Sequence, residues 1–190
     1  MVNWDELNTL YVYDRKDWRA WLEKHFEKEP DIYLLYAKKA SGKPRISYND
    51  AVEEALCFGW IDSIVRKYDK DFSAQRFSPR KNKSRYSQPN IERLRWLQKE
   101  GLLHLRIEAE VNEIISQKFV FPEDVIEELR KDAEAWKNYQ GFSDGYKRIR
   151  IAYIDSARKR PKEFEKRLQN FIKKTHANKI FGFGGIEKYF

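Results

Sequence analysis

The segment EALCFGWIDS, residues 54–63, changes from one backbone periodicity to another. Ahead of it, Ser47 and Asp50 form a helix N-terminal signal. Apolar residues then recur at the spacing of one helix face, namely Ala51, Val52, Ala55 and Leu56. Gly59 follows, and glycine readily adopts the left-handed backbone that ends many helices. The apolar residues of Trp60–Arg66 favour a strand. A helix must therefore turn directly into a strand here, which constrains this half of the chain to helices packed on a sheet.

Strand signals are confined to the first half of the chain. The apolar run Ile32–Lys38 predicts a buried strand. Phe72–Ser78 predicts a strand that pairs with Trp60–Arg66 across the polar turn Tyr68–Asp71. A helix is predicted over Asp17–Phe26, with Asp17 as its N-cap. Together these elements predict a small antiparallel sheet packed with helices.

Beyond residue 101 the apolar spacing is helical. Ser87 is predicted to cap a helix that ends at Gly101, and further helices are expected over residues 104–117, 122–139, 143–159 and 161–178. The fold class is therefore α+β, with the sheet in the N-terminal half and a helical C-terminal portion. We expect an α+β unit over residues 1–101 and a helical portion over 102–178 that shares its core. A tail over 179–190 is expected to be held by Phe181, Phe183 and Phe190.

Composition excludes several classes of protein. The single cysteine, Cys57, rules out an internal disulfide and any zinc site built from several cysteines. The longest apolar run, Ile32–Ala37, is far short of the roughly 20 residues that a membrane helix needs. The acidic N-terminal segment MVNWDELNTL lacks the basic and apolar regions of a signal peptide. We therefore expect a soluble, cytoplasmic protein without a membrane span.

The net charge of +8 is unevenly distributed. Residues 76–99 hold eight basic side chains and one acidic one, residues 147–179 hold twelve and three, and residues 108–134 hold three and nine. Clustered Lys and Arg neutralise phosphates, so the two basic segments predict nucleic acid as one class of partner. The alternative is that these charges form solvated faces. Aromatic residues of the second segment could stack on bases, but their spacing fits a helical core better, as in Ile149, Tyr153, Ile154, Phe164, Leu168, Phe171 and Ile172.

Two side chains of the opening segment are candidates for chemistry. Cys57 lies near the C-terminal end of its helix, where the dipole disfavours a thiolate, so a buried structural role is favoured. Asp62 shares a strand face with Trp60, and a buried carboxylate needs a partner. The candidate partners are Arg66, Arg76, Arg80 and Arg85. Such a pair either holds the next loop in place or orients an arginine toward a ligand. An enzyme that uses Asp62 as acid or base, with Cys57 nearby, is a further alternative.

The loop Pro79–Ser87 brings four basic residues to the start of the helix that Ser87 caps. Free backbone N–H groups and the positive end of the helix dipole favour an anion there. We therefore expect a cleft that accepts a small anionic ligand, such as a phosphate or a carboxylate. Its candidate ligand-binding residues are Trp60, Asp62, Arg66, Arg80, Lys83, Ser84, Arg85, Ser87 and Asn90. The sequence indicates no cofactor, no metal and no particular protein partner.

Several of these stretches resemble one family. They are Ala55–Asp62 (ALCFGWID), Phe77–Arg80 (FSPR), Ser84–Ser87 (SRYS) with Asn90, and the helix that ends at Gly101. Over residues 14–103 the chain resembles the bacteriocin-protection, YdeI/OmpD-associated family, although Tyr86 replaces the usual tryptophan and Ser78 the usual threonine. The resemblance implies a link to bacteriocin resistance or envelope stress, and no particular reaction or catalytic residue. A binding protein with an anion-accepting cleft is favoured over a nucleic-acid-binding protein and over an enzyme.

Overall fold

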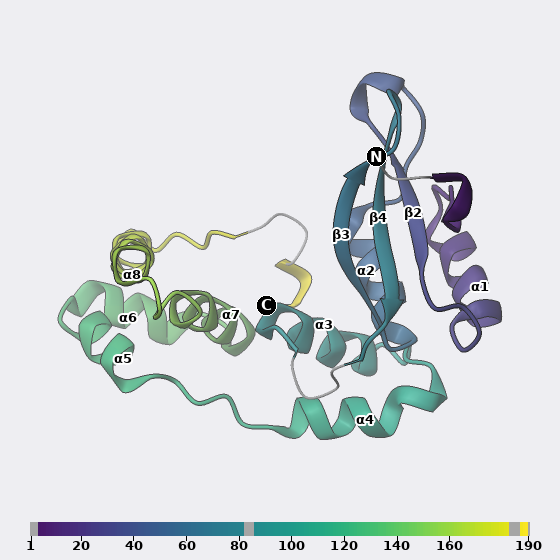
Figure 1. Cartoon of the computed structure of the whole chain (residues 1–190). Helices are drawn as coiled ribbons and strands as arrows, with labels where there is room; N and C mark the ends of the chain where they lie inside the picture. The colour runs from purple at the N-terminus through teal and green to yellow at the C-terminus, as the bar shows by residue number, and fades with distance from the viewer. Residues whose placement is uncertain (1–3, 82–85, 183–186, 190) are drawn as a thin grey trace. The chain divides into compact units, whose positions relative to one another are not determined.

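The computed structural model of the chain describes residues 4–81, 86–182 and 187–189 (Figure 1). It is 55% helical and 14% strand, which confirms the α+β fold class. The chain divides into two compact units. Unit 1 comprises Met1–Arg85 and Leu94–Ile114, and unit 2 comprises Tyr86–Arg93 and Ile115–Phe190. The expected domain boundaries at residues 101 and 178 stay a prediction.

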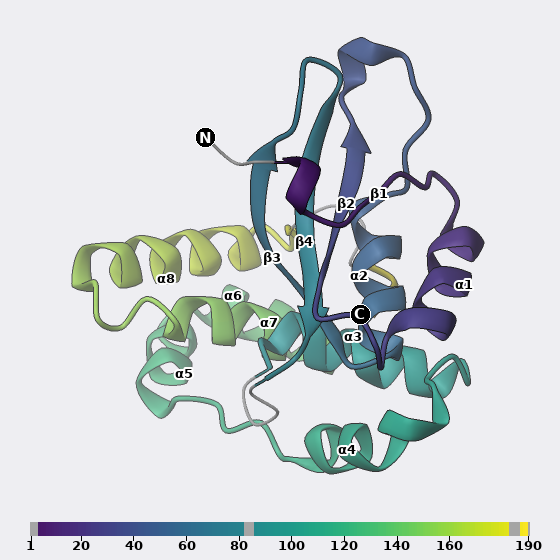
Figure 2. The same cartoon turned by 45° about the vertical axis from the view of Figure 1, so that its right-hand side comes forward.

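Unit 1 is built on a sheet in which the described strands follow the order β1-β2-β4-β3 (Figure 2). The strands are β1 (Thr9–Leu10), β2 (Ile32–Ala37), β3 (Trp60–Lys67) and β4 (Phe72–Pro79). β4 pairs antiparallel with both β2 and β3, whereas the short β1 adds to β2 in parallel. A register shift between Asp62 and Val65 marks a bulge in β3. Ile64 and Val65 are exposed at this bulge, on the outer strand of the sheet.

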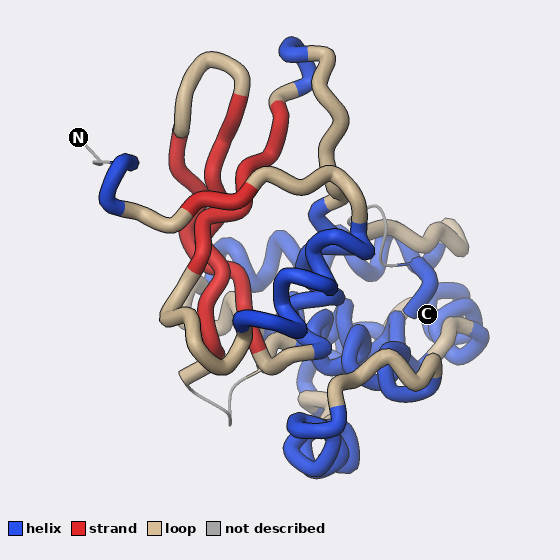
Figure 3. Tube along the Cα trace, turned by 90° about the vertical axis from the view of Figure 1, so that its right-hand side faces the viewer, coloured by secondary structure: helices blue, strands red, loops and turns tan. Residues whose placement is uncertain are grey.

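Two helices pack beside this sheet (Figure 3). Helix α1 (Arg15–His25) begins at Asp14, whose side chain caps the first turn. The sequence predicted Asp17 as the N-cap, and this is wrong, because Asp14 has the extended backbone of a cap and Asp17 already lies in the first turn. Helix α2 (Tyr48–Cys57) begins after Ser47, which caps it as predicted. A short 3₁₀ helix, η2 (Lys39–Ser41), lies between β2 and α2.

The two faces of the sheet have different cores. On the helix side, Trp18 of α1 is fully buried and meets the ring of Phe77 at 5.5 Å between centroids. Its indole N–H donates a hydrogen bond to the Ala51 carbonyl of α2 at 3.0 Å. On the other face, Trp4 of the 3₁₀ helix η1 (Trp4–Glu6) packs edge-on against Tyr33 at 5.4 Å. Both faces of the sheet are thus anchored by tryptophan.

Helix α3 (Gln88–Lys99) contains the boundary between the two units, and α4 (Leu105–Ser116) follows it. The turn between them uses Gly101, which has a left-handed φ of 66°. The His104 N–H then donates to the Cys57 carbonyl at 3.0 Å. This bond ties the start of α4 to the end of α2 within unit 1.

Unit 2 contains α5 (Glu123–Arg130), α6 (Ala133–Gly141), α7 (Asp144–Asp155) and α8 (Pro161–His176). The sequence predicted one helix over residues 122–139, and this is wrong. Asp132 has an extended backbone, and its carboxylate accepts a hydrogen bond from the Ala135 N–H at 2.9 Å, so it starts a new helix. The helices predicted over 143–159 and 161–178 are confirmed, the second with Pro161 in its first turn.

The core of unit 2 draws on all four of these helices. Its fully buried members include Val125, Leu129, Ala135, Tyr146, Ile151 and Phe171. Phe181, in the segment after α8, packs against this core, and Tyr189 of the 3₁₀ helix η3 (Glu187–Tyr189) is also buried. Phe183 and Phe190, which were expected to hold the tail, lie outside the described residues. Among the residues described, no helix is long and apolar enough to cross a membrane.

Gly59 provides a test of the turn between α2 and β3. Its φ is 71°, and an added Cβ would meet the Ile107 Cγ2 atom at 3.3 Å. We therefore expect Gly59→Ala to lower the free energy of unfolding by about 1–2 kcal/mol, measured by urea denaturation. Gly141→Ala is the matched control, because its φ is not left-handed and no described atom lies within 4 Å of an added Cβ. Equal losses in the two variants would contradict this account.

Candidate functional site

The ALCFGWID stretch lies where α2 meets β3. Cys57 and Phe58 are buried, and Gly59 makes the turn between the two elements. Trp60 is also buried, and its indole N–H donates a hydrogen bond to the carbonyl of Phe26, just after α1, at 3.0 Å. The stretch is therefore a packing junction that joins both helices to the sheet.

Asp62 is held by neutral donors. Its Oδ2 atom accepts hydrogen bonds from the Tyr48 hydroxyl at 3.0 Å and from Gln75 Nε2 at 2.7 Å. The sequence predicted an arginine partner, and this is wrong for the described residues, where Arg76 pairs with another carboxylate and Arg66 is exposed. Gln75 can bond Asp62 because β4 places it on the same sheet face, next to Asp62 on β3. The carboxylate thus belongs to the sheet rather than to the basic loop.

A pocket of about 300 Å³ lies beside this junction within unit 1. Trp60 and Arg80, two of the expected ligand-binding residues, line it together with Arg106, Glu27 and Glu110. The Nη1 atom of Arg106 lies 2.5 Å from the carboxylate of Glu27. Two acidic side chains therefore balance two basic ones, and the lining has no net preference for an anion.

The other expected residues fall in different places. Three of them lie outside the described residues, namely Lys83, Ser84 and Arg85. Ser87 and Asn90 belong to unit 2, where Asn90 Oδ1 accepts a hydrogen bond from Arg93 Nη1 at 2.9 Å. Trp60 and Arg80 thus share a pocket, whereas Asp62 bonds elsewhere on the sheet. The full set as a ligand site stays a prediction.

Cys57 is fully buried at the end of α2. Burial, together with the charge of Glu54, raises the pKa of its thiol to about 12, although Arg19 and Arg15 oppose the shift. The thiol is therefore protonated at neutral pH, and a protonated thiol is a poor nucleophile. In the described part of the chain, no group of three or more His, Cys, Asp or Glu side chains is placed to hold a metal ion.

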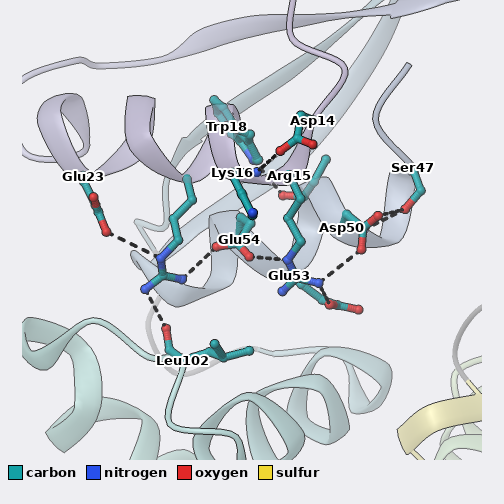
Figure 4. A network of polar contacts seen from close by, with 12 residues as sticks. Asp14, Arg15, Lys16, Trp18, Glu23, Ser47, Asp50, Glu53, Glu54 and Leu102 are labelled. Carbon is teal, nitrogen blue, oxygen red and sulfur yellow. Dashed lines mark hydrogen bonds and ion pairs between the residues drawn. The ribbon is translucent and has the colours of Figure 1, made fainter. Parts of the chain in front are cut away.

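Helix α2 carries two buried carboxylates that sequence reasoning missed. Glu53 and Glu54 are both almost fully buried, and Arg15 of α1 lies against both (Figure 4). Arg15 Nη1 lies 2.8 Å from Glu53, and its Nε contacts Glu54. Arg19 Nη1 lies 2.8 Å from the other oxygen of Glu54. Each carboxylate thus has a charged partner from the neighbouring helix.

This network reaches beyond the two helices. Arg19 Nη2 donates to the carbonyl of Leu102, in the turn after α3, at 3.1 Å. Burial alone would lower the pKa of Arg15, but the charges and hydrogen bonds of Glu54 and Glu53 outweigh it and raise the pKa. Glu53 and Glu54 are adjacent and lie among apolar residues of the helix. Neighbouring positions point in different directions around a helix, so both cannot reach solvent beside a wide buried stripe, and the sequence could have indicated a buried acid here.

A second pocket, of about 390 Å³, lies within unit 2. Helices α7 and α8 and the segment after α8 form its walls. The lining includes Arg150, Tyr153, Lys166, Arg167, Phe171 and Phe181. Its size falls in the range of roughly 300–1,000 Å³ that is usual for small-molecule sites. We call it the Arg150 pocket.

Arg150 is 4% exposed, and its surroundings are largely aromatic. Its Nε and Nη2 atoms are buried, and neither finds a hydrogen-bond partner among the residues that the structure describes. The rings of Tyr146 and Phe181 lie 5.6 and 5.1 Å from its Cζ atom. Burial lowers the pKa of Arg150, and Tyr146 and Tyr153 offset this only in part. Ring faces thus stabilise the cation while two of its donors stay unused.

Arg148, also in unit 2, has hydrogen-bond acceptors for the corresponding edge of its guanidinium, Nε and Nη2. It stands two residues earlier on α7, and its Nε and Nη2 atoms donate to the two carboxylate oxygens of Glu92 at 2.6 and 2.8 Å. This planar edge matches two oxygens of a carboxylate or a phosphate. In Arg150 the same edge lacks an acceptor within the described ranges. The Arg150 pocket therefore has at its wall a fork that fits an anion, although Gly182 lies against Nη2 and a ligand reaches both nitrogens only if this backbone moves aside.

The remaining charges leave the pocket net positive. Arg167 is engaged, since its Nε donates to Glu163 at 2.7 Å and its guanidinium lies 3.8 Å from the ring of Tyr153. Lys166, the residue before Arg167 on α8, is exposed. Three basic side chains and one acidic side chain thus line the pocket, and Arg167 and Glu163 neutralise each other.

Sequence reasoning found the basic segment 147–179 but did not single out Arg150. It treated Ile149, Tyr153 and Ile154 as a core stripe, and Ile149 and Ile154 are indeed buried. Tyr153 is partly exposed and lines the pocket. The sequence signal that could have singled out Arg150 is its position directly after the core residue Ile149. A basic residue buried at such a position needs a partner. Counting charges along the chain does not reveal such a residue.

Two family models match the chain, at different places. Residues 10–110 match a domain of unknown function, DUF8412, and since this match covers more than half of the chain, the chain belongs to that family. Residues 118–178 match the bacteriocin-protection, YdeI or OmpD-associated family. No curated protein and no solved structure matches the chain.

The second match confirms the resemblance to the YdeI/OmpD-associated family but gives it another place. The residues that carry the resemblance in the sequence, 14–103, lie wholly within the DUF8412 match. The match to the YdeI/OmpD-associated family instead covers α5, α6, α7 and α8. It therefore includes Arg150 and most of its pocket.

The ion network between α1 and α2 predicts that removal of the Glu54 carboxylate strongly lowers the stability of the fold. Glu54→Ala would leave Arg15 and Arg19 without their shared carboxylate, and we expect the free energy of unfolding to fall by about 3 kcal/mol, measured by urea denaturation. Glu23→Ala is the control, because Glu23 is half-exposed and lies 3.5 Å from the same Arg19. Its loss should stay below about 1 kcal/mol. A Glu54 variant as stable as the Glu23 variant would show that the network contributes little.

The raised pKa of Cys57 predicts slow thiol chemistry. At about pH 8, near the ordinary thiol pKa, we expect a maleimide to label the unfolded chain promptly and the native chain only at the rate at which it opens. Mass spectrometry of samples quenched over time measures both rates. Native labelling as fast as unfolded labelling would place the thiol in contact with solvent and contradict its burial.

Proposed function

We propose that the chain is a binding protein for a small anion, which occupies the Arg150 pocket. The observation that carries the proposal is the buried Arg150 guanidinium, with Nε and Nη2 lacking acceptors in the described residues. A buried donor without an acceptor costs about 1–3 kcal/mol, and more when it is charged. A ligand that supplies two oxygens removes this cost once the Gly182 backbone, which lies against Nη2, moves aside.

The charge and shape of the pocket support the same ligand. Its lining carries net positive charge, which raises the local concentration of anions. Arg167 is already paired with Glu163, so Arg150 is the arginine of the pocket that lacks a carboxylate partner among the described residues. The planar edge of Arg150 also favours carboxylate or phosphate over spherical anions such as chloride, because two parallel hydrogen bonds need two oxygens.

The family matches suggest a setting for this binding. Residues 118–178, which hold most of the pocket, match a family whose name refers to bacteriocin protection. We extend this link to the chain and propose that anion binding in the cytoplasm contributes to bacteriocin resistance or to an envelope-stress response.

The two alternatives have weaker support. Nucleic-acid binding would use aromatic residues for stacking, but Tyr146 and Phe171 of the second basic segment are buried in the core. An enzyme centred on Asp62 would need a reactive neighbour, and the pKa of Cys57 is raised to about 12 by burial. Asp62 itself is bonded to Tyr48 and Gln75 within the fold. Anion binding in unit 2 is therefore the function that the geometry supports best.

Arg150→Met tests the proposal, since it removes the fork and keeps a long side chain between the two rings. We expect benzoate or phosphate to raise the thermal midpoint of the wild type relative to chloride at equal ionic strength, and to leave the variant unchanged. Without these anions the variant should be at least as stable as the wild type, because two buried unsatisfied donors are gone. Differential scanning calorimetry measures both effects.

Arg160→Met is the matched control for this experiment. It removes the same charge by the same substitution from an exposed residue just before α8, outside the pocket lining. The anion-dependent rise should persist in this variant. A rise that survives Arg150→Met, or that both substitutions reduce equally, would refute binding at Arg150 and point to general screening of the basic surface.

A further inference from the structure

We infer that the ligand of the Arg150 pocket is an organic anion with a ring-sized apolar body, and that Phe181 selects this body. The inference rests on the proposed function, because it names the ligand class of the same site. The shared chemistry of the class is an acid group with two oxygens joined directly to a flat apolar group. Aromatic carboxylates and aryl phosphates both belong to it.

Apolar side chains surround the unused edge of Arg150. Ile154 and Phe171 are buried and form part of the pocket lining. The ring of Phe181 lies 5.1 Å from the Arg150 Cζ atom and 6.4 Å from the ring of Phe171. Tyr153 adds a partly exposed ring to the same lining. An inorganic anion would satisfy the guanidinium and leave this apolar surface in contact with water, whereas an apolar body would cover it.

Phe181 is held in place by its neighbours. Its backbone N–H donates to the Tyr146 hydroxyl at 3.3 Å, which anchors the segment after α8 to α7. The next residue, Gly182, lies so close to Arg150 that an added Cβ would stand 2.4 Å from Nη2. Glycine at this position therefore allows the backbone to approach the guanidinium and brings the Phe181 ring over it. The half-buried Phe181 ring is therefore placed to contact a ligand that displaces Gly182 and bonds the same donors.

The charges of the pocket fit a ligand with its acid group inward. Arg150 is the buried cation, and Lys166 is the exposed one. An acid group that bonds Arg150 therefore carries its apolar body along the aromatic lining, toward solvent. Aromatic rings also pack well against planar groups, so a flat body suits Phe181 and Tyr153 better than a branched aliphatic one.

Isothermal titration calorimetry of the full chain with matched pairs of probes tests this inference. Benzoate is compared with acetate, and phenyl phosphate with inorganic phosphate. We expect each phenyl-bearing anion to bind about tenfold or more tightly than its partner, since burial of a phenyl ring contributes at least this factor. Benzyl alcohol, which has the ring but no charge, should bind far more weakly than benzoate. The two pairs also distinguish a carboxylate head from a phosphate head.

Phe181→Ala should reduce the preference for the phenyl-bearing anions toward equality while binding of acetate and phosphate persists. Phe164→Ala is the matched control, because Phe164 packs against the same core outside the pocket lining and should leave the preference intact. Equal affinity of paired probes in the wild type, with Arg150-dependent binding, would overturn this inference and keep the proposed function. Absence of Arg150-dependent binding for all probes would overturn both.

Discussion

Unit 1 depends on the match of buried charges between two helices. The carboxylates of Glu53 and Glu54 have almost no access to water, so α2 covers the sheet at little cost only when α1 lies beside it and supplies arginines. The position of α1 in turn places Trp18 over β4 and lets the end of α1 receive the indole N–H of Trp60. The geometry of the helix–strand junction thus depends on an ion network that lies several residues away from it.

Arg150 of unit 2 lacks such a match among the described residues. Arg148 and Arg150 lie on the same helix, and Glu92 satisfies the first with two hydrogen bonds while aromatic rings surround the second. Buried polar groups without partners are rare in native proteins, and where they occur they tend to mark functional sites. The lack of an acceptor for Arg150 within the described residues sets stability against binding. A substitution that gave the guanidinium a permanent partner would stabilise the fold, but it would also take up the donors that a ligand would use.

Periodicity in the sequence predicted most of the helices and strands, including the turn at Gly59 and the cap at Ser47. It failed where a short polar residue interrupts a helical pattern, as at Asp132, because a local hydrogen bond outweighs the spacing of apolar residues. Partners of buried charges were harder still. The neutral donors around Asp62 and the empty edge of Arg150 arise from residues far apart in the chain. Such contacts depend on tertiary packing and leave only a faint local signal.

The bulge in β3 also affects whether two copies of the chain can pair through this edge strand. An outer strand presents unpaired backbone groups, and exposed Ile64 and Val65 would make it attractive to a second strand. The register shift between Asp62 and Val65 bends the strand away from a flat edge, and the exposed Arg66 and Lys67 add like charges that repel an identical neighbour. The fold can therefore leave apolar side chains in water on this strand without offering a template for β-sheet aggregation.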